Sequence, residues 1–408
     1  MGRALICGYY GHYNLGDEAM LAGMLHQLRQ WRPEASPTVY SNHPTDTAQR
    51  HGVATFNQAA VYRRRAILRR RLELLWTLTQ HRYFVLGGGD LLRDGPQRSV
   101  AAVWLTPLQQ AIALRRRSVV WGVSVGEVWR PETAQQIRQV LNTTELIGVR
   151  DNGSAEALRS LGVIRPIYVG PDLALLRPVP LSVPASPSGP EGLVPKKRLQ
   201  VGVAWRAIAN RHRSANAVPE NAAPDGLPPD NFEHLQRSMA ALLDWLVETY
   251  DAEIHLIPFQ AFPEAYRRQH RPAVDDYSST LTLLRGCRHA EQMQLYSYVP
   301  YLGQLDAILS KLDLMIGMRL HSLILAARMG IPSLAIEYDL KVSRFMAAVG
   351  QSHNSISLKN FTLPTAISKT TQLLDDIDAA RQSVRVGLHQ YHQAGAMAMA
   401  AFEDFWRA

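Results

Sequence analysis

The alternation of apolar and polar positions along the first 176 residues predicts a parallel α/β sheet. Short apolar runs alternate with stretches of helical periodicity, which is the pattern of βαβ units. After the first apolar run, for example, Leu21, Met24, Leu25 and Leu28 recur at the spacing of one helix face. The predicted strands are ALICGY near the start of the chain and residues 83–87, 118–126, 146–150 and 166–170.

A second alternating series follows a stretch dominated by Pro, Ser and Gly at 177–198, which predicts an interdomain linker. Its strands are expected at LQVGVAW, EIHLIPF, LDLMIG and SLAIEY. Residues 207–230 lack periodicity and predict a long loop. We therefore predict two Rossmann-like domains facing a cleft, at 1–176 and 199–380, an arrangement that resembles the GT-B fold. Residues 381–408 are expected to form a helix that packs back on the body.

The composition of the chain limits which partners and which cellular compartment we expect for the protein. The 408 residues carry a formal net charge of +9, which attracts nucleic acid, phosphorylated small molecules or an anionic membrane. No RNA- or DNA-binding module is recognisable, so a nucleic-acid partner is not expected. Two cysteines are too few for a disulfide framework or a Cys-rich zinc site. With no spanning apolar run and no secretory signal, we expect a cytoplasmic protein.

Ligands of open α/β sheets bind beyond the carboxyl ends of the strands, so polar residues there are candidates. In GYYGHYNLGDE, Asn14 and Asp17 are either helix caps or ligand contacts. The segment is not a GxGxxG fingerprint and no Walker lysine follows, which disfavours NAD and ATP. Gly88 and Gly89 at the end of another strand offer bare backbone to a ligand or serve a tight turn. Arg150 ends a further strand and either faces the cleft or forms a salt bridge.

The strongest candidate is the segment LDLMIGMRLHSLILAA in the second half. Arg319 and His321 are predicted in the first helical turn after the apolar strand, where unpaired backbone N–H groups and the helix dipole favour an anion. The alternative is a surface arginine and a core histidine. Arg206 and Gln260 lie at two other predicted strand ends, and Lys341 lies just past a third. Together these side chains predict an anion site in the second domain.

Six blocks of the sequence carry a resemblance to a known family. They are, in order, GYYGHYNLGDEAML, GGG followed by LL and D, GVRDNGSAEAL, VGPDLAL, GMRLHSLILAA and EYDLKVSRF. The ordered set resembles the polysaccharide pyruvyl transferase family, and most of all its CsaB type, over about residues 17 to 350. Arg93 stands where CsaB-type sequences more often have Gln, and VGPDLAL departs from the usual ADP-containing form.

The resemblance implies transfer of the pyruvyl group of phosphoenolpyruvate to two hydroxyls of one sugar, giving a cyclic ketal and phosphate without a cofactor or metal. For the CsaB type it implies a lipid-diphosphate-linked amino-sugar acceptor, later part of a cell-wall polymer that anchors surface-layer proteins. Arg206, Arg319 and Lys341 would then grip the donor. His321 would protonate its methylene carbon, and Asp17 would deprotonate a sugar hydroxyl. The other expected substrate-binding residues are Arg150, Asn14, Gly88, Gly89 and Gln260.

Residues 61–78 combine two arginine triplets with leucines and Trp76. As a helix, this segment would lie on an anionic membrane surface, consistent with a lipid-linked acceptor, or would be a basic solvated helix whose leucines face the core. Two other functions stay open at this stage. A GT-B glycosyltransferase would release a nucleotide instead of phosphate, and a non-catalytic sugar-binding or scaffold protein would bind without turnover.

Overall fold

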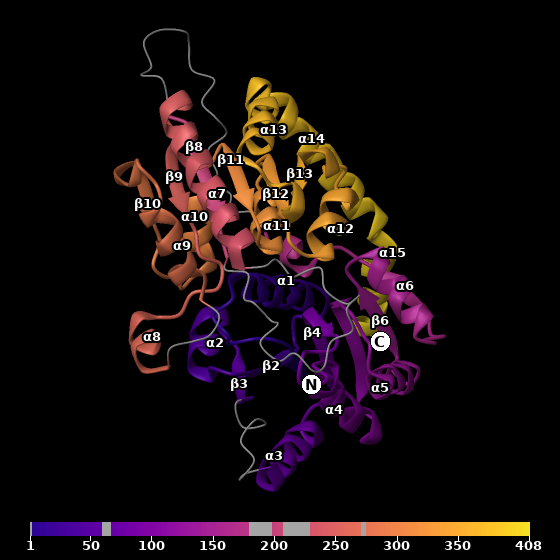
Figure 1. Ribbon diagram of the computed structural model, residues 1–408. Coiled ribbons are helices and arrows are strands. Elements are labelled where there is room, and N and C mark those ends of the chain that lie inside the picture. Colours follow the sequence, from indigo (N-terminus) through magenta and orange to yellow (C-terminus); the bar gives the residue numbers. More distant parts are fainter. Residues whose placement is uncertain (1, 59–66, 179–197, 207–228, 271–274) are drawn as a thin grey trace. The chain divides into compact units, whose positions relative to one another are not determined.

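The computed structural model describes residues 2–58, 67–178, 198–206, 229–270 and 275–408 (Figure 1). The side chains of residues 67–71 and 229–232 also lie outside the description. The described residues divide into two compact units. The described residues up to 178 and from 391 to 408 belong to the first, called here the N-terminal unit. The described residues 198–206, 229–270 and 275–390 belong to the second, the C-terminal unit.

The N-terminal unit is built on a seven-stranded sheet in the order β3-β2-β1-β4-β5-β6-β7. Every neighbouring pair is parallel. The direction of winding changes between β1 and β4, which makes this pair the topological switch point of the sheet. The strands are β1 Arg3–Cys7, β2 Ser36–Ser41, β3 Ala54–Asn57, β4 Tyr83–Leu92, β5 Arg117–Val125, β6 Leu146–Val149 and β7 Ile167–Val169.

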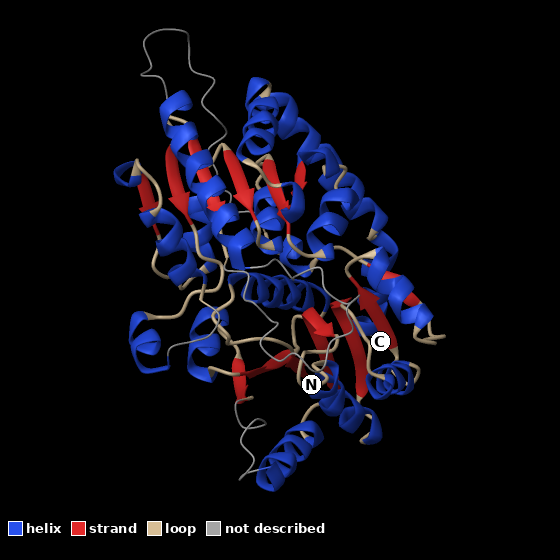
Figure 2. Cartoon of the chain, in the orientation of Figure 1, coloured by secondary structure: helices blue, strands red, loops and turns tan. Residues whose placement is uncertain are grey.

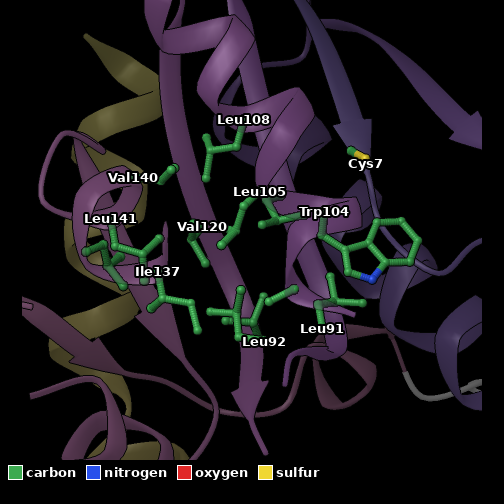
Figure 3. Packing of buried hydrophobic residues seen from close by; sticks show 14 of the residues in the cluster. Cys7, Leu91, Leu92, Trp104, Leu105, Leu108, Val120, Ile137, Val140 and Leu141 are labelled. Carbon is green, nitrogen blue, oxygen red and sulfur yellow. The ribbon is translucent and has the colours of Figure 1, made fainter. Parts of the chain in front are cut away.

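The helices at Leu15–Trp31 and Ala101–Ala113 bury apolar residues in the core, as the helical spacing of those residues predicts. Leu21, Met24, Leu25 and Leu28 of the first helix are all buried. Figure 3 shows Trp104 and its neighbours packed with Val120 in the core. The helices are α1 Leu15–Trp31, α2 Pro44–His51, α3 Ile67–Thr79, α4 Ala101–Ala113, α5 Pro131–Leu141, α6 Asn152–Ser160, η3 Leu173–Leu176 and α15 Ala396–Arg407.

The last helix of the chain, α15, packs on the sheet of the N-terminal unit. Phe402 stacks on Trp121 of β5 with ring centroids 4.8 Å apart. The carbonyl oxygen of Trp406 accepts a hydrogen bond from Arg32 Nη1 at 2.9 Å. The final residues therefore belong to the same core as the first ones.

Strand β4 corrects the sequence prediction at the glycine run. The run was expected to end the strand, but β4 continues through it to Leu92. Gly88 and Gly89 have φ values of 70° and 102°, which side chains other than glycine rarely adopt. The register with β5 shifts between Gly89 and Leu92. The glycines thus form an irregularity inside a strand, because only they permit the backbone to turn there and then resume pairing.

The C-terminal unit contains a six-stranded sheet in the order β10-β9-β8-β11-β12-β13, again with every neighbouring pair parallel (Figure 2). Here the winding changes direction between β8 and β11. The strands are β8 Gln200–Ala204, β9 Glu253–Leu256, β10 Met293–Leu295, β11 Leu314–Gly317, β12 Ser333–Glu337 and β13 Ser355–Ser357. The two parallel sheets confirm the predicted α/β class with two Rossmann-like halves.

The helices of the C-terminal unit begin with α7, whose bounds correct one prediction. Residues 229 and 230 were assigned to the long loop but belong to α7, and 207–228 lie outside the described residues, as do 179–197 of the predicted linker. Among the described helices, none has the length and apolar character needed to cross a bilayer. The helices are α7 Pro229–Tyr250, α8 Glu264–His270, α9 Asp276–Arg285, η4 Ala290–Gln292, α10 Leu302–Leu309, α11 Leu320–Arg328, α12 Leu340–Ala348, η5 Ser352–Asn354, η6 Leu358–Asn360, α13 Leu363–Asp375 and α14 Ile377–Ala394.

Candidate active site

Two of the predicted arginines flank the switch point of the C-terminal sheet. Arg206 comes two residues after β8, and Arg319 comes two residues after β11. Because β8 and β11 are the neighbours at which the winding reverses, both side chains start where open parallel sheets bind their ligands. The two arginines predicted to form an anion site therefore start at the position where the sheet topology favours ligand binding.

A tyrosine that the sequence analysis did not single out lies among the predicted cations. The Tyr338 hydroxyl accepts a hydrogen bond from Arg206 Nη1 at 2.9 Å, and the guanidinium carbon is 4.7 Å from the ring centroid. Lys341 Nζ is 5.6 Å from the same centroid and 2.9 Å from an Asp339 carboxylate oxygen. Asp339 also caps α12 through the Lys341 backbone N–H. We call Arg206, Arg319, Lys341 and Tyr338 the tyrosine-centred cluster.

The positive charges of this cluster act on the pKa of Tyr338. Burial acts to raise the pKa of this phenol, but the positive charges of Lys341, Arg206 and Arg319 outweigh burial and hold the pKa below its usual value. The pKa of Asp339 is lowered as well, because the same Lys341 and Arg206 charges outweigh its burial. A buried phenol whose pKa is held below its usual value indicates a positive potential at this position, which favours an incoming anion.

Arg319 is anchored on a buried carboxylate. Its Nε donates to Asp276 Oδ2 at 2.8 Å, Nη2 donates to Asp276 Oδ1, and Nη2 also lies 3.3 Å from Gln260 Oε1. The Gln260 backbone N–H in turn donates a hydrogen bond to Asp276 Oδ2 at 2.9 Å. This two-point contact fixes the plane of the guanidinium. Gln260, predicted to contact substrate, contacts Arg319 in the structure.

The start of α11 lies one residue later than expected. Arg319 is the N-cap residue, with extended backbone angles, and Leu320 is the first helical residue. His321 is the second residue of α11 and therefore does lie in its first turn. Arg319 and His321 follow the same strand end, so the structure brings them to the same edge of the sheet.

In the N-terminal unit, the predicted residues Asn14 and Asp17 open α1. The Asn14 side chain accepts a hydrogen bond from the Gly16 N–H at 3.0 Å, which is the capping role given as the alternative to ligand binding. Asp17 is 7% exposed, and a Cβ placed on Gly89 would lie 3.2 Å from its Oδ1. A side chain at Gly89 would therefore crowd the carboxylate proposed as the base.

The neighbouring Glu18 was missed by the sequence analysis. It is 1% exposed, accepts a 3.0 Å hydrogen bond from the Gly11 N–H, and lies 2.7 Å from His51 Nε2. Burial acts to raise its pKa, but hydrogen bonding and charge from His51, helped by Gly11 and Arg50, outweigh burial and lower the pKa. The buried Glu18 carboxylate thus holds the loop after β1 through its hydrogen bond with Gly11.

Arg150 forms the salt bridge that was the alternative to a substrate contact. Its Nη1 lies 2.9 Å from Asp172 Oδ2, and the two side chains are 5% and 1% exposed. The Arg150 carbonyl also accepts a hydrogen bond from the Tyr391 hydroxyl at 2.9 Å. These contacts join the ends of β6 and β7 to Tyr391, within the N-terminal unit. Substrate binding by Arg150 stays a prediction.

The comparison with known families bears on what this site does. Residues 14–339 match the family model "Polysaccharide pyruvyl transferase". The chain belongs to this family. The polysaccharide pyruvyl transferase predicted from the sequence blocks is thereby confirmed as a family, and with it a transferase in polysaccharide pyruvylation. The CsaB subtype stays a prediction. No curated protein sequence matches the chain.

Solved structures similar to this member of the pyruvyl transferase family include UDP-N-acetylglucosamine 2-epimerases and a glycosyltransferase. One is a UDP-N-acetylglucosamine 2-epimerase from Listeria monocytogenes, with a TM-score of 0.62 and 11% identity over 99% of this chain and 96% of that one. Another is the Neisseria meningitidis UDP-GlcNAc 2-epimerase bound to UDP-GlcNAc, with a TM-score of 0.59 and 11% identity over 99% of both chains. A glycosyltransferase from Rickettsia africae gives a TM-score of 0.57 at 8% identity over 100% and 98%. These likenesses show a GT-B-type fold and nothing about the substrate.

Proposed function

We propose that this chain transfers the pyruvyl group of phosphoenolpyruvate to two hydroxyls of one sugar. The observation that carries the proposal is the tyrosine-centred cluster, in which three cations surround one buried phenol at the switch point of the C-terminal sheet. Phosphoenolpyruvate presents a phosphate and a carboxylate, and arginine forks and lysine ammonium groups recognise both. A nucleotide sugar would need contacts for a base and a ribose as well.

The residues of the C-terminal unit suit the first chemical step. Protonation of C3 converts the enol double bond into a methyl group and leaves C2 electrophilic, and a sugar hydroxyl then attacks C2 and gives up its proton. We assign the C3 proton to His321, since an imidazole can hold and release a proton near neutral pH. We assign Arg206 and Lys341 to the phosphate and Arg319 to the carboxylate. Asp17 of the N-terminal unit is the proposed acceptor of the hydroxyl proton.

In the second step, phosphate leaves C2 and the second hydroxyl of the sugar takes its place. The proton of that hydroxyl leaves with the phosphate, so one phosphoenolpyruvate and one diol give one ketal and one phosphate. The cations of the tyrosine-centred cluster stabilise the charge that develops on the departing phosphate. Neither step needs a redox cofactor.

A lipid-diphosphate-linked amino-sugar acceptor, as in the CsaB type, is supported by the surface of α3. Leu74 and Leu78 of this helix are buried, whereas Leu72 and Trp76 are 58% and 68% exposed. Of the two arginine triplets, Arg63 to Arg65 lie outside the described part, and Arg69 to Arg71 lie in α3, although their side chains are not described. An exposed leucine and tryptophan beside a basic run suit the inner face of an anionic membrane. Leu72→Ala combined with Trp76→Ala should reduce co-flotation with anionic vesicles at low salt, with neutral vesicles as the control.

The donor assay tests the function directly. Purified protein is incubated with phosphoenolpyruvate and a panel of lipid-linked amino-sugar disaccharides, and both phosphate release and product mass are measured. We expect phosphate release that depends on the acceptor and a product that carries a pyruvyl ketal. Release of nucleotide from a sugar nucleotide, without consumption of phosphoenolpyruvate, would instead establish a glycosyltransferase. Binding of sugar with no turnover of either donor would establish a sugar-binding protein.

A further inference from the structure

The loop after β1 lies at the switch point of the N-terminal sheet, and its backbone is fixed from several sides. The Gly11 N–H donates to Glu18 Oε1 at 3.0 Å, and the Gly11 carbonyl accepts from His43 Nδ1 at 2.6 Å. The Tyr10 carbonyl accepts from the Asn42 N–H at 3.0 Å. One peptide group is thus held through both its polar atoms. These contacts restrict the loop to one backbone conformation, which suits a binding site.

The same loop contains a backbone conformation that is costly for its residue. Tyr13 has a φ of 55°, in the left-handed region that bulky side chains rarely adopt. Gly11, two residues before Tyr13, has a φ of 73°, and a Cβ on Gly11 would lie 2.2 Å from Ser41 Oγ. Such strain persists where the surrounding contacts impose it, and it occurs preferentially at ligand-binding loops. The contacts of Gly11 supply the constraint here.

His12 lies between these two residues. Its ring stacks on Tyr9 with centroids 3.8 Å apart and planes inclined by 7°, and Tyr9 meets the edge of Trp104 at 6.5 Å. The His12 side chain is partly exposed, but its Nε2 is buried and has no hydrogen-bond partner within the described part of the chain. A buried polar atom that the fold leaves without a partner is costly, which a ligand group can relieve.

The charge state of His12 indicates what kind of ligand group fits. Burial and the nearby His43 lower the pKa of His12 to about 4, against the opposing effect of Glu18. The imidazole is therefore neutral at neutral pH and offers one hydrogen-bond donor and one acceptor. A neutral ring pairs with a hydroxyl better than with a phosphate, whose cationic partners lie in the C-terminal unit. The ligand group indicated is a neutral hydroxyl.

We propose that His12, stacked on Tyr9, is a recognition residue for the acceptor sugar and forms a hydrogen bond with one of its hydroxyls. The inference rests on the proposed function in taking that sugar as the acceptor of the pyruvyl group. The stacking on Tyr9 fixes the plane of the imidazole, and the imidazole binds a hydroxyl of the sugar. Asp17 keeps its proposed role as proton acceptor, and His12 selects the sugar.

Steady-state kinetics test this role through the two substrates separately. His12→Phe keeps the ring for stacking on Tyr9 but removes both nitrogens. We expect its KM for the acceptor to rise about tenfold, the cost of one lost hydrogen bond, with the KM for phosphoenolpyruvate within twofold of wild type. His12→Asn should recover part of the loss. His26→Asn, on the same unit, is the matched control. An unchanged acceptor KM in His12→Phe overturns the proposal.

Nuclear magnetic resonance separates this inference from the proposed function, since it needs no turnover. The His12 ring signal should not titrate between pH 6 and 8, and methyl glycosides of N-acetylglucosamine, N-acetylmannosamine and galactose serve as probes. A saturable shift of the His12 signal with at least one probe supports the inference, even if phosphoenolpyruvate is never consumed. Turnover of phosphoenolpyruvate with no response of the His12 signal to any acceptor overturns the inference and leaves the proposed function standing.

Discussion

The hydroxyl of Tyr338 accepts a hydrogen bond from Arg206 Nη1 at 2.9 Å, while the ring of the same tyrosine lies under the same guanidinium at 4.7 Å. Two interactions with different geometric requirements therefore hold one arginine. The hydrogen bond fixes its distance and the ring contact fixes its tilt. Because Arg206 follows β8 and Tyr338 follows β12, this pair connects two strand ends across β11. The result is an arginine whose fork is oriented before an anion binds.

Removing only the hydroxyl of Tyr338 should weaken donor binding. Tyr338→Phe keeps the ring under Arg206 but loses the hydrogen bond, which is worth about 1 kcal/mol. We expect the KM for phosphoenolpyruvate to rise about fivefold with the KM for the acceptor unchanged. Tyr301→Phe, whose side chain is 49% exposed in the same unit, is the control. An unaltered donor KM would mean that the hydroxyl does not orient the site.

The pKa of Tyr338 should report donor binding. The charges of Lys341, Arg206 and Arg319 hold this pKa below its usual value against the effect of burial. A bound phosphate or carboxylate offsets part of that positive charge, so the pKa of Tyr338 should rise when phosphoenolpyruvate is added. Ultraviolet absorbance of tyrosinate, measured against pH with and without the donor, follows the shift. The signal should be missing in Tyr338→Phe, and a fall of the pKa would contradict an anion site.

Asp276 should be needed for stability through Arg319. Its carboxylate is buried and takes two guanidinium N–H groups, so Asp276→Asn leaves a cation without its counter-charge. Breaking such a buried pair costs about 3 kcal/mol. Urea denaturation of the whole protein measures the loss in free energy of unfolding. Asp251→Asn removes the partner of Arg198 from a surface pair with side chains 40% and 72% exposed, where we expect almost no change.

The substitution Arg319→Lys separates the effect of Arg319 on protein stability from its proposed role in binding the donor. A lysine retains the charge beside Asp276 but cannot make the two-point contact. If Arg319 holds the carboxylate of the donor, phosphoenolpyruvate affinity should fall by at least tenfold, more than in Tyr338→Phe. Isothermal titration of the folded variant measures this directly. Wild-type affinity in Arg319→Lys would limit Arg319 to a structural role.

The parts of the fold that the sequence predicted are those with a strong local pattern. Buried parallel strands such as β5 and β11 are continuous apolar runs, and α1 has helical periodicity over its whole length. Strands β2, β3, β10 and β13 were not predicted, because polar residues interrupt their apolar positions. Three of them, β3, β10 and β13, are edge strands of their sheets. The extension of β4 depends on the φ of Gly88 and Gly89, and no residue pattern specifies that conformation.

The site was predictable only as far as strand-end position reveals it. Arg206, Arg319 and Lys341 follow strands, and the structure gathers them about one tyrosine. Tyr338 was missed because a tyrosine after an apolar run looks like core. Asp276 was missed because it opens a helix distant in sequence from Arg319. Which arginine pairs with which carboxylate depends on tertiary contacts, as the Arg150–Asp172 salt bridge shows.

The buried carboxylate Glu18 gives a prediction about pH. Its folded pKa lies below the ordinary glutamate value of 4.5, so the carboxylate stabilises the fold above that pH. The stabilisation is lost as the pH falls through the folded pKa. Glu18→Gln should cost about 2 kcal/mol at pH 7, through weaker contacts with Gly11 and His51. The difference from wild type should shrink below pH 4.5. Thermal unfolding against pH tests this, with exposed Glu156→Gln as control. A pH-independent difference would contradict it.

His321 provides the last prediction, because its proposed proton is delivered to carbon and can be traced. In deuterium oxide, the pyruvyl methyl group of the product should contain one deuterium, which mass spectrometry detects. His321→Ala should lower kcat by at least a hundredfold, since general acid catalysis contributes roughly 10²–10⁴. Its affinity for phosphoenolpyruvate should stay within a few-fold of wild type, because Arg206, Arg319 and Lys341 remain. Near-wild-type turnover in His321→Ala would remove this residue from the protonation step, and a loss of donor affinity equal to the loss of rate would make it a binding residue instead.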